Sequence, residues 1–257
     1  MLVSLTDNSK CEVFVNIFQH LKLFSVNINL YFKEEKLYIQ GMDSSHVSIF
    51  ELNIEKSWFD VYEITEDSVI GVNSTILFRI MNTRTFGQVI SIHNENDSLE
   101  LDLINKEENK EDFNKYFKIP MMDVDEDMME IPETDYDVDM TMSSKKFKSL
   151  VDQLSNFSDT LDIIYSDEKI YLNSESIEEG CMKIEIKLDD LEGCEVTEDV
   201  SLSLSFATRY IQNMTQFLKI SKDVQIEVMN DTPLRITYKI CDNNYIRFFL
   251  APKIKDD

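Results

Sequence analysis

A unit of one amphipathic helical stretch followed by two short strand-like runs occurs four times along the 257 residues. The helical stretches start 64, 70 and 63 residues apart, at Asn8–Phe24, Val72–Gly87, Met142–Ser158 and Ser205–Lys222. The strand-like pairs that follow are Ser25–Tyr31 with Lys36–Gln40, Gln88–His93 with Ser98–Leu103, Thr160–Tyr165 with Lys169–Asn173, and Val224–Met229 with Leu234–Ile240. Repetition at a fixed period predicts pseudo-symmetry, here two similar halves with two units each.

The residue periodicity within each unit predicts an α+β fold. In the first helical stretch Phe14, Ile17 and Leu21 share one face, as a 3.6-residue period requires. In the strand-like run near the end of the chain, Val224 and Ile226 alternate with polar residues, which is the period of a half-buried strand. Charged or Asn/Asp turns separate the two runs of each pair, so each pair is expected to form an antiparallel hairpin.

Charge is distributed unevenly between the helical stretches and the rest of the chain. The formal net charge is −24, yet the four stretches contain ten cations and only two anions, Glu12 and Asp152, which leaves −32 elsewhere. The ten cations are Lys10, Lys22, Arg79, Arg84, Lys145, Lys146, Lys148, Arg209, Lys219 and Lys222. Lys145 and Lys219 lie opposite the apolar faces of their helices, so we expect them to face solvent. This sorting of charge predicts one surface for a polyanion and another that repels it.

The segment from Pro120 to Pro132 is acidic and rich in methionine. Prolines at both ends disfavour a continuous helix or a central strand, so we interpret the segment as an extended connector. The predicted organisation is an N-terminal domain at 1–119, a connector at 120–133 and a C-terminal domain at 134–257.

The sequence gives little indication of a metal-binding, cofactor-binding or membrane protein. The cysteines (Cys11, Cys181, Cys194 and Cys241) form no paired motif and the three histidines do not cluster, so no zinc site and no cofactor are predicted. No signal peptide and no apolar run of about 18 residues are recognised. The acidic run Asp123–Asp127 lacks the glycine of a calcium loop, and no P-loop or nucleophile elbow is present, so we do not expect an enzyme. A protein that inhibits by mimicking DNA would account for the net negative charge, but it would leave the four basic helical stretches unexplained.

Two motifs near opposite ends of the chain indicate a family. Gly41–Ser48 (Gly-Met-Asp-Ser-Ser-His-Val-Ser) and Leu250–Ile254 (Leu-Ala-Pro-Lys-Ile) resemble the proliferating cell nuclear antigen family, the sliding clamps of eukaryotic-type replication. Met122–Asp125 and Phe206–Tyr210 follow the same register. The resemblance implies a DNA-clamp fold, with two helices and surrounding antiparallel sheet in each domain, and a ring of three subunits. The implied partners are double-stranded DNA without sequence preference, a DNA polymerase, other proteins with short clamp-binding motifs and a clamp loader. The nucleus, or a cytoplasmic viral replication site, is the expected location.

The resemblance also carries over site residues. The ten cations are expected to face DNA. The partner pocket is expected at Met42, His46, Val47, Ile49, Met129, Ile131, Pro132, Pro233, Phe249, Ala251 and Pro252. The edges that join subunits are expected at Asp112–Ile119 and Gly180–Lys187, through Phe113, Tyr116, Phe117, Met182, Ile184 and Ile186. The alternative is a subunit of a heterotrimeric checkpoint clamp. The pocket residues and the short C-terminus argue against this alternative.

The chain departs from the family pattern at several basic positions. Family cations fall on Val15, Asn16 and Asn82, and two more fall near Ser149 and Asp152. The sum of positive charge is kept while its positions differ, which sequence-blind contact with a polyanion would permit. Such divergence would suit a large DNA virus or a distant eukaryote.

Overall fold

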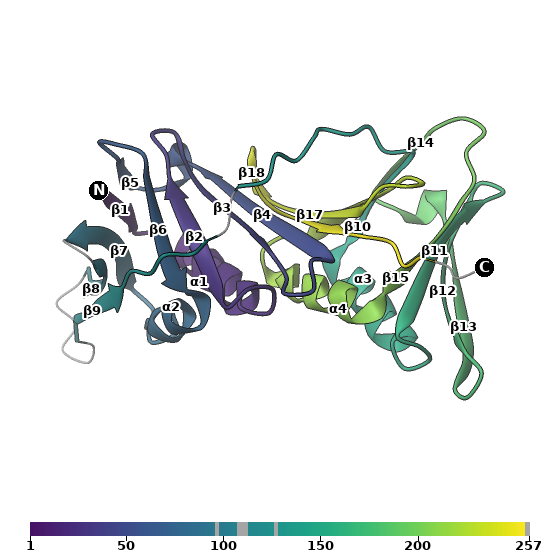
Figure 1. Cartoon of the computed structure of the whole chain (residues 1–257), viewed down its shortest axis with the longest axis horizontal. Coiled ribbons are helices and arrows are strands. Elements are labelled where there is room, and N and C mark those ends of the chain that lie inside the picture. Colours follow the sequence, from purple (N-terminus) through teal and green to yellow (C-terminus); the bar gives the residue numbers. More distant parts are fainter. Residues whose placement is uncertain (96–97, 107–112, 126–127, 255–257) are drawn as a thin grey trace. The chain divides into compact units, whose positions relative to one another are not determined.

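The computed structural model describes residues 1–95, 98–106, 113–125 and 128–254 (Figure 1). Contacts divide the chain into two compact units. The N-terminal unit comprises Met1–Ser44, Glu51–Met129 and Ile240–Tyr245, and the C-terminal unit comprises Ser45–Phe50, Glu130–Lys239 and Ile246–Asp257. Helices and antiparallel sheet occur in both, as the sequence predicts.

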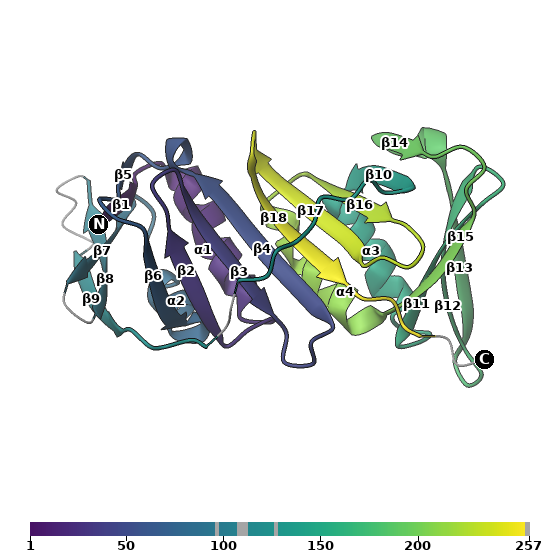
Figure 2. The same cartoon turned by 45° about the horizontal axis from the view of Figure 1, so that its top comes forward.

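The strands of the N-terminal half form two antiparallel runs, ordered β5-β1-β7-β8-β9 and β4-β3-β2-β6. Its helices α1 and α2 lie side by side, which both views show (Figures 1 and 2). The elements are β1 (Leu2–Leu5), α1 (Asn8–Leu21), β2 (Asn27–Phe32), β3 (Lys36–Met42), β4 (Ser48–Glu55), the 3-10 turn η1 (Lys56–Trp58), β5 (Val61–Glu63), β6 (Ser68–Asn73), α2 (Ser74–Met81), β7 (Gln88–Glu95), β8 (Ser98–Asn105) and β9 (Lys115–Pro120).

The C-terminal half repeats this order, with an α-helix after its first and its sixth strand. Its strands run β13-β12-β11-β15 and β14-β10-β16-β17-β18. The elements are β10 (Val138–Ser143), α3 (Ser144–Leu154), β11 (Thr160–Ser166), β12 (Lys169–Ser176), β13 (Gly180–Lys187), the 3-10 turn η2 (Leu188–Asp190), β14 (Gly193–Val196), β15 (Leu202–Ala207), α4 (Thr208–Met214), the 3-10 turn η3 (Thr215–Lys219), β16 (Asp223–Val228), β17 (Leu234–Cys241) and β18 (Asn244–Leu250). The pseudo-symmetry predicted from the repeat is therefore present in the element order.

Three of the four helices begin later than the sequence predicted. Val72, Met142 and Ser205 belong to the strands β6, β10 and β15, each of which ends at the residue before its helix begins. The apolar residues at these junctions fit the period of a strand as well as that of a helix. Periodicity alone therefore assigned the ends of the strands to the helices. The N-cap of α2 is Asn73, whose side-chain oxygen accepts a hydrogen bond from the Ile76 amide at 3.0 Å. The fourth stretch is divided between α4 and η3.

An aromatic cluster forms the centre of the N-terminal unit beneath α1. Phe14 packs edge-on against Phe18 with ring centroids 5.0 Å apart, and Trp58 packs edge-on against Phe59 at 5.4 Å. Aromatic pairs of this kind contribute about 0.5–1.5 kcal/mol beyond their buried area. In the C-terminal unit Phe217 packs against Phe248 at 4.9 Å. These cores fix which face of each helix turns away to solvent.

Candidate nucleic-acid and partner interfaces

The basic side chains of the C-terminal helices lie on the faces opposite the core. In α3 the side chains of Phe147, Val151 and Leu154 are buried, whereas Lys145 and Lys146 are exposed. Six of the ten predicted cations are solvent-exposed: Arg79, Lys145, Lys146, Arg209, Lys219 and Lys222. The prediction that Lys145 and Lys219 face solvent is therefore confirmed.

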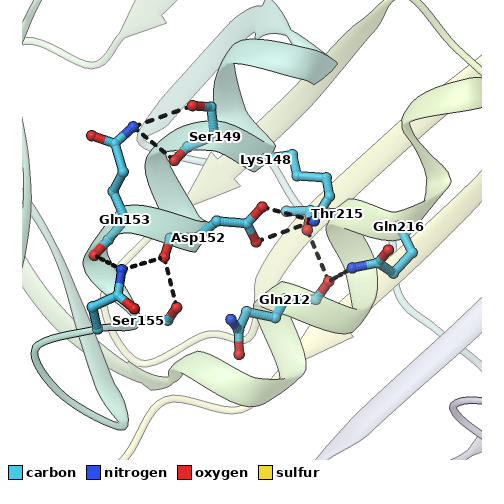
Figure 3. Close-up of polar contacts among 9 residues, drawn as sticks. Lys148, Ser149, Asp152, Gln153, Ser155, Gln212, Thr215 and Gln216 are labelled. Atoms are coloured by element: carbon cyan, nitrogen blue, oxygen red, sulfur yellow. Dashed lines mark hydrogen bonds and ion pairs between the residues drawn. The ribbon is translucent and has the colours of Figure 1, made fainter.

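The remaining cation of α3, Lys148, pairs with a carboxylate of the same helix, and side-chain amides nearby bond to backbone carbonyls (Figure 3). The ammonium of Lys148 lies 3.1 and 2.9 Å from the two carboxylate oxygens of Asp152, one turn further along the helix. Gln153 donates to the Ser149 carbonyl at 2.9 Å, and Gln216 donates to the Gln212 carbonyl at 3.0 Å. The charge of Lys148 is thus partly neutralised by Asp152, and the other side chains labelled in Figure 3 carry no charge.

The cations of the N-terminal unit make more intramolecular contacts. Lys10 donates to the Trp58 carbonyl at 2.6 Å and lies 3.9 Å from a carboxylate oxygen of Asp60. Arg84 donates to the Gln88 carbonyl at 2.7 Å and to the side-chain oxygen of Asn8. Lys22 lies over the ring of Phe78, with its ammonium 4.3 Å from the ring centroid, a cation–π contact. Lys10 and Arg84 therefore tie segments of this unit together.

Asp60 also receives hydrogen bonds that hold the beginning of α1. It accepts from the amide of Thr6 at 2.5 Å and from the Thr6 hydroxyl at 2.8 Å. Partial burial acts to raise the pKa of Asp60, but these two bonds and the nearby Lys10 outweigh it and hold the pKa below its usual range.

Each of two sheets ends in a strand with one free edge among the described residues. β9 pairs only with β8, and β13 pairs only with β12. β13 has the predicted bounds, whereas the other edge begins at Lys115 rather than Asp112, which lies outside the described residues. Phe113 and Tyr116 are 79% and 68% exposed. Phe117, Met182 and Ile184 are half-buried and Ile186 is buried.

Most predicted pocket residues that belong to the C-terminal unit gather where β18 ends. The Ala251 amide donates to the Val47 carbonyl at 3.0 Å, which places the loop before β4 beside the chain that leaves β18. His46 is exposed and has a left-handed backbone (φ 57°). Phe249 is buried, with 7% of its surface exposed. Val47, Ile49, Ile131 and Pro252 are half-buried, and Pro132, Pro233 and Ala251 are exposed.

The described residues of the connector that belong to the N-terminal unit contain no helix. Pro120 is the last residue of β9, and Glu126 and Asp127 lie outside the described residues. A cavity of about 530 Å³ lies beside the connector and is lined by Met42, by Asp123–Asp125 and by Lys22–Asn27. Met42 and Met129 are half-buried.

A second, polar cavity of about 500 Å³ lies in the C-terminal unit. Arg235 and Glu227 pair within it through two hydrogen bonds, and burial raises the pKa of Asp139 beside them.

Among the described residues, no three His, Cys, Asp or Glu side chains are placed to hold a metal ion. The same part of the chain contains no helix long and apolar enough to cross a membrane.

Comparisons with known proteins match nearly the whole chain. The family descriptions "Proliferating cell nuclear antigen, N-terminal domain" and "C-terminal domain" match residues 6–129 and 130–253. A probable DNA polymerase sliding clamp 2 of Paramecium bursaria Chlorella virus 1 is 31% identical over 89% of this chain and 83% of the relative. Proliferating cell nuclear antigen 2 of Plasmodium falciparum is 27% identical over 95% of this chain and 97% of the relative.

A solved structure shows the same fold. The crystal structure of a PCNA2-PCNA3 complex from Sulfolobus tokodaii superposes with a TM-score of 0.86 at 20% identity, over 98% of this chain and 99% of that chain. Fold and relatives together define a DNA sliding clamp, a non-enzymatic processivity factor. The chain belongs to the proliferating cell nuclear antigen family.

Three contacts that hold the connector were not recognised from the sequence. They come from Gly71, Asn29 and Gln40 and reach Met122, Val124 and Met129. The sequence separations of the two side-chain contacts are 95 and 89 residues. No local pattern in the sequence could reveal these contacts.

Proposed function

We propose that the chain forms a homotrimeric ring that encircles duplex DNA and tethers a polymerase to it. The observation that carries this proposal is the placement of six exposed cations, five of them on α2, α3, α4 and the 3-10 turn η3 and the sixth, Lys222, shortly after η3. Lys and Arg attract the phosphate backbone without reading sequence, as a clamp that slides requires. The charge of −32 in the rest of the chain would discourage DNA from binding elsewhere.

The free edges of β9 and β13 are suited to closing the ring. An unpaired strand edge offers main-chain donors and acceptors to another chain, and head-to-tail contacts can close into a ring. Pairing β9 of one protomer with β13 of the next would also cover Tyr116 and Ile184. Ring closure would then repeat the same contact three times.

Partner proteins are proposed to dock through short motifs beside the connector. The apolar side chains of Val47, Ile49 and Ile131 remain partly exposed and would receive aliphatic and aromatic residues of such a motif. The acidic connector would attract basic residues that flank it. The partners in this proposal are a polymerase, repair proteins and a clamp loader, at the replication site of a nucleus or of a virus.

A heterotrimeric assembly, such as a checkpoint clamp, is the second candidate. The observation that favours it is that the similar Sulfolobus tokodaii structure is a complex of two different clamp chains. Light scattering of the purified chain separates the candidates. The homotrimer requires the mass of three chains of 30.1 kDa, whereas a single-chain mass at micromolar concentration would reject it.

DNA contact is tested by reversing Lys145, Lys146 and Lys148 to Glu together. We expect weaker retention on DNA and less clamp-stimulated synthesis with the oligomer mass unchanged. Lys239→Glu, an exposed lysine of β17, is the control and should leave both retention and synthesis intact. Unchanged retention in the triple variant would count against α3 as a DNA-facing helix.

A further inference from the structure

Three residues of the N-terminal unit form a row across neighbouring strands. Asn29 of β2 lies opposite Gly71 of β6 on one side and opposite Gln40 of β3 on the other. Directly opposed residues project on the same face of a sheet, and adjacent strands lie about 4.8 Å apart. The row therefore runs across the strands, and the connector follows it.

The first two positions of the row contact the connector backbone. The Met122 amide donates to the Gly71 carbonyl at 3.0 Å, and the Asn29 side-chain amide donates to the Val124 carbonyl at 3.1 Å. A Cβ atom at residue 71 would lie 2.1 Å from the Met122 carbonyl oxygen. Because that oxygen belongs to the backbone, only glycine allows the connector to approach so closely.

The third position makes a two-point contact. The side-chain oxygen of Gln40 accepts from the Met129 amide at 2.7 Å, and its side-chain nitrogen donates to the Met129 carbonyl at 3.0 Å. This arrangement reproduces the pair of bonds that two residues of an antiparallel ladder exchange. Gln40 is 5% exposed, so loss of these bonds would leave buried polar groups unpaired.

A second hydrogen bond orients the amide of Gln40. Its nitrogen also donates to the Tyr38 hydroxyl at 3.1 Å, and that hydroxyl donates to a carboxylate oxygen of Glu51 at 2.9 Å. Burial, together with the nearby Glu51, raises the pKa of Tyr38 well above its usual range, so the hydroxyl keeps its proton. The chain from Glu51 to Gln40 thus presents the amide to Met129 in one orientation.

We propose that Gly71, Asn29 and Gln40 position the connector for partner docking, with Gln40 as the principal positioning residue. The inference rests on the proposed docking function. Every contact reaches the connector backbone, so the row fixes where the connector lies while its side chains remain free to vary. The connector can therefore hold methionines at 128 and 129 without losing its register on the sheet.

The test measures the connector and docking separately on the full-length chain. Gln40→Met keeps the volume and removes the hydrogen bonds, and Tyr38→Phe is a milder second variant that removes only the orienting hydroxyl. Hydrogen exchange at the Met129 amide should accelerate about tenfold in Gln40→Met and less in Tyr38→Phe. The affinity for a synthetic clamp-binding peptide should fall about three- to tenfold, with retention on DNA unchanged.

Gln88→Met is the matched control. Gln88 is 1% exposed, and its side chain donates to the Phe113 carbonyl at 2.9 Å instead of to the connector. Exchange at Met129 that is unchanged in Gln40→Met, or equally accelerated in Gln88→Met, would overturn the inference. Faster exchange with undiminished peptide affinity would also overturn it. A wild-type chain that binds no such peptide would instead reject the docking function, and with it this inference.

Discussion

Neutralising Asp152 should strengthen DNA binding, because the carboxylate now competes with phosphate for Lys148. The two side chains are 26% and 46% exposed and lie one helical turn apart. A pair of this kind contributes only about 0.3–0.5 kcal/mol to helix stability. Asp152→Asn should therefore leave the free energy of unfolding within about 0.5 kcal/mol of wild type while it releases the ammonium.

The gain follows from counterion release. Each phosphate that a cation neutralises steepens the dependence of log K on log salt by about 0.9. One additional phosphate contact would therefore increase the loss of affinity between 50 and 200 mM salt by about 3.5-fold. The advantage of Asp152→Asn should be largest at low salt and fade towards 200 mM.

Fluorescence anisotropy of a short labelled duplex, titrated at several salt concentrations, measures this slope. Lys148→Ala and the double variant complete a mutant cycle, and the gain should vanish in the double variant. Glu12→Gln, which removes another exposed carboxylate from α1, controls for the change in net charge. Equal slopes for wild type and Asp152→Asn, or a gain that persists without Lys148, would refute this account.

Three further perturbations address the other surfaces. Ile131→Ala combined with Phe249→Ala should abolish stimulation of a polymerase without changing the oligomer mass, and normal stimulation would reject the pocket. Phe113→Ala combined with Tyr116→Ala should lower the oligomer mass measured by light scattering. Phe86→Ala, a control at a side chain that is 78% exposed, should leave the mass unchanged. An unchanged mass in the double variant would exclude β9 from the interface. The pKa of the Asp60 carboxyl is lower in the folded chain than in the unfolded chain. The ionised carboxylate therefore stabilises the fold at pH values above its pKa in the unfolded chain, and this stabilisation is lost as the pH falls through its pKa in the folded chain. The difference in unfolding free energy between wild type and Asp60→Asn should therefore shrink towards acidic pH in chemical denaturation, and a constant difference would contradict the role given to Thr6.

The repeat and the residue periods were sufficient to predict that four helical segments, the hairpins and a duplicated order are present, but not where three of the helices begin. Burial of one face imposes these periods locally, so the sequence displays them. The roles of Lys10 and Arg84 could not be predicted in the same way. Their partners Trp58 and Asn8 lie 48 and 76 residues away, and only the folded chain brings them together. For the same reason the docking of the connector on Gln40 was not predicted.

The absence of any linker between β6 and α2, β10 and α3, or β15 and α4 restricts how these helices can evolve. Each residue added to a helix turns the following side chains by about 100°. A single insertion at such a junction would therefore rotate Lys145 or Arg209 towards the core and apolar residues towards solvent. Substitutions can move a cation by a turn along the same face, but insertions and deletions here should be selected against, so variation in length should be confined to the hairpin turns.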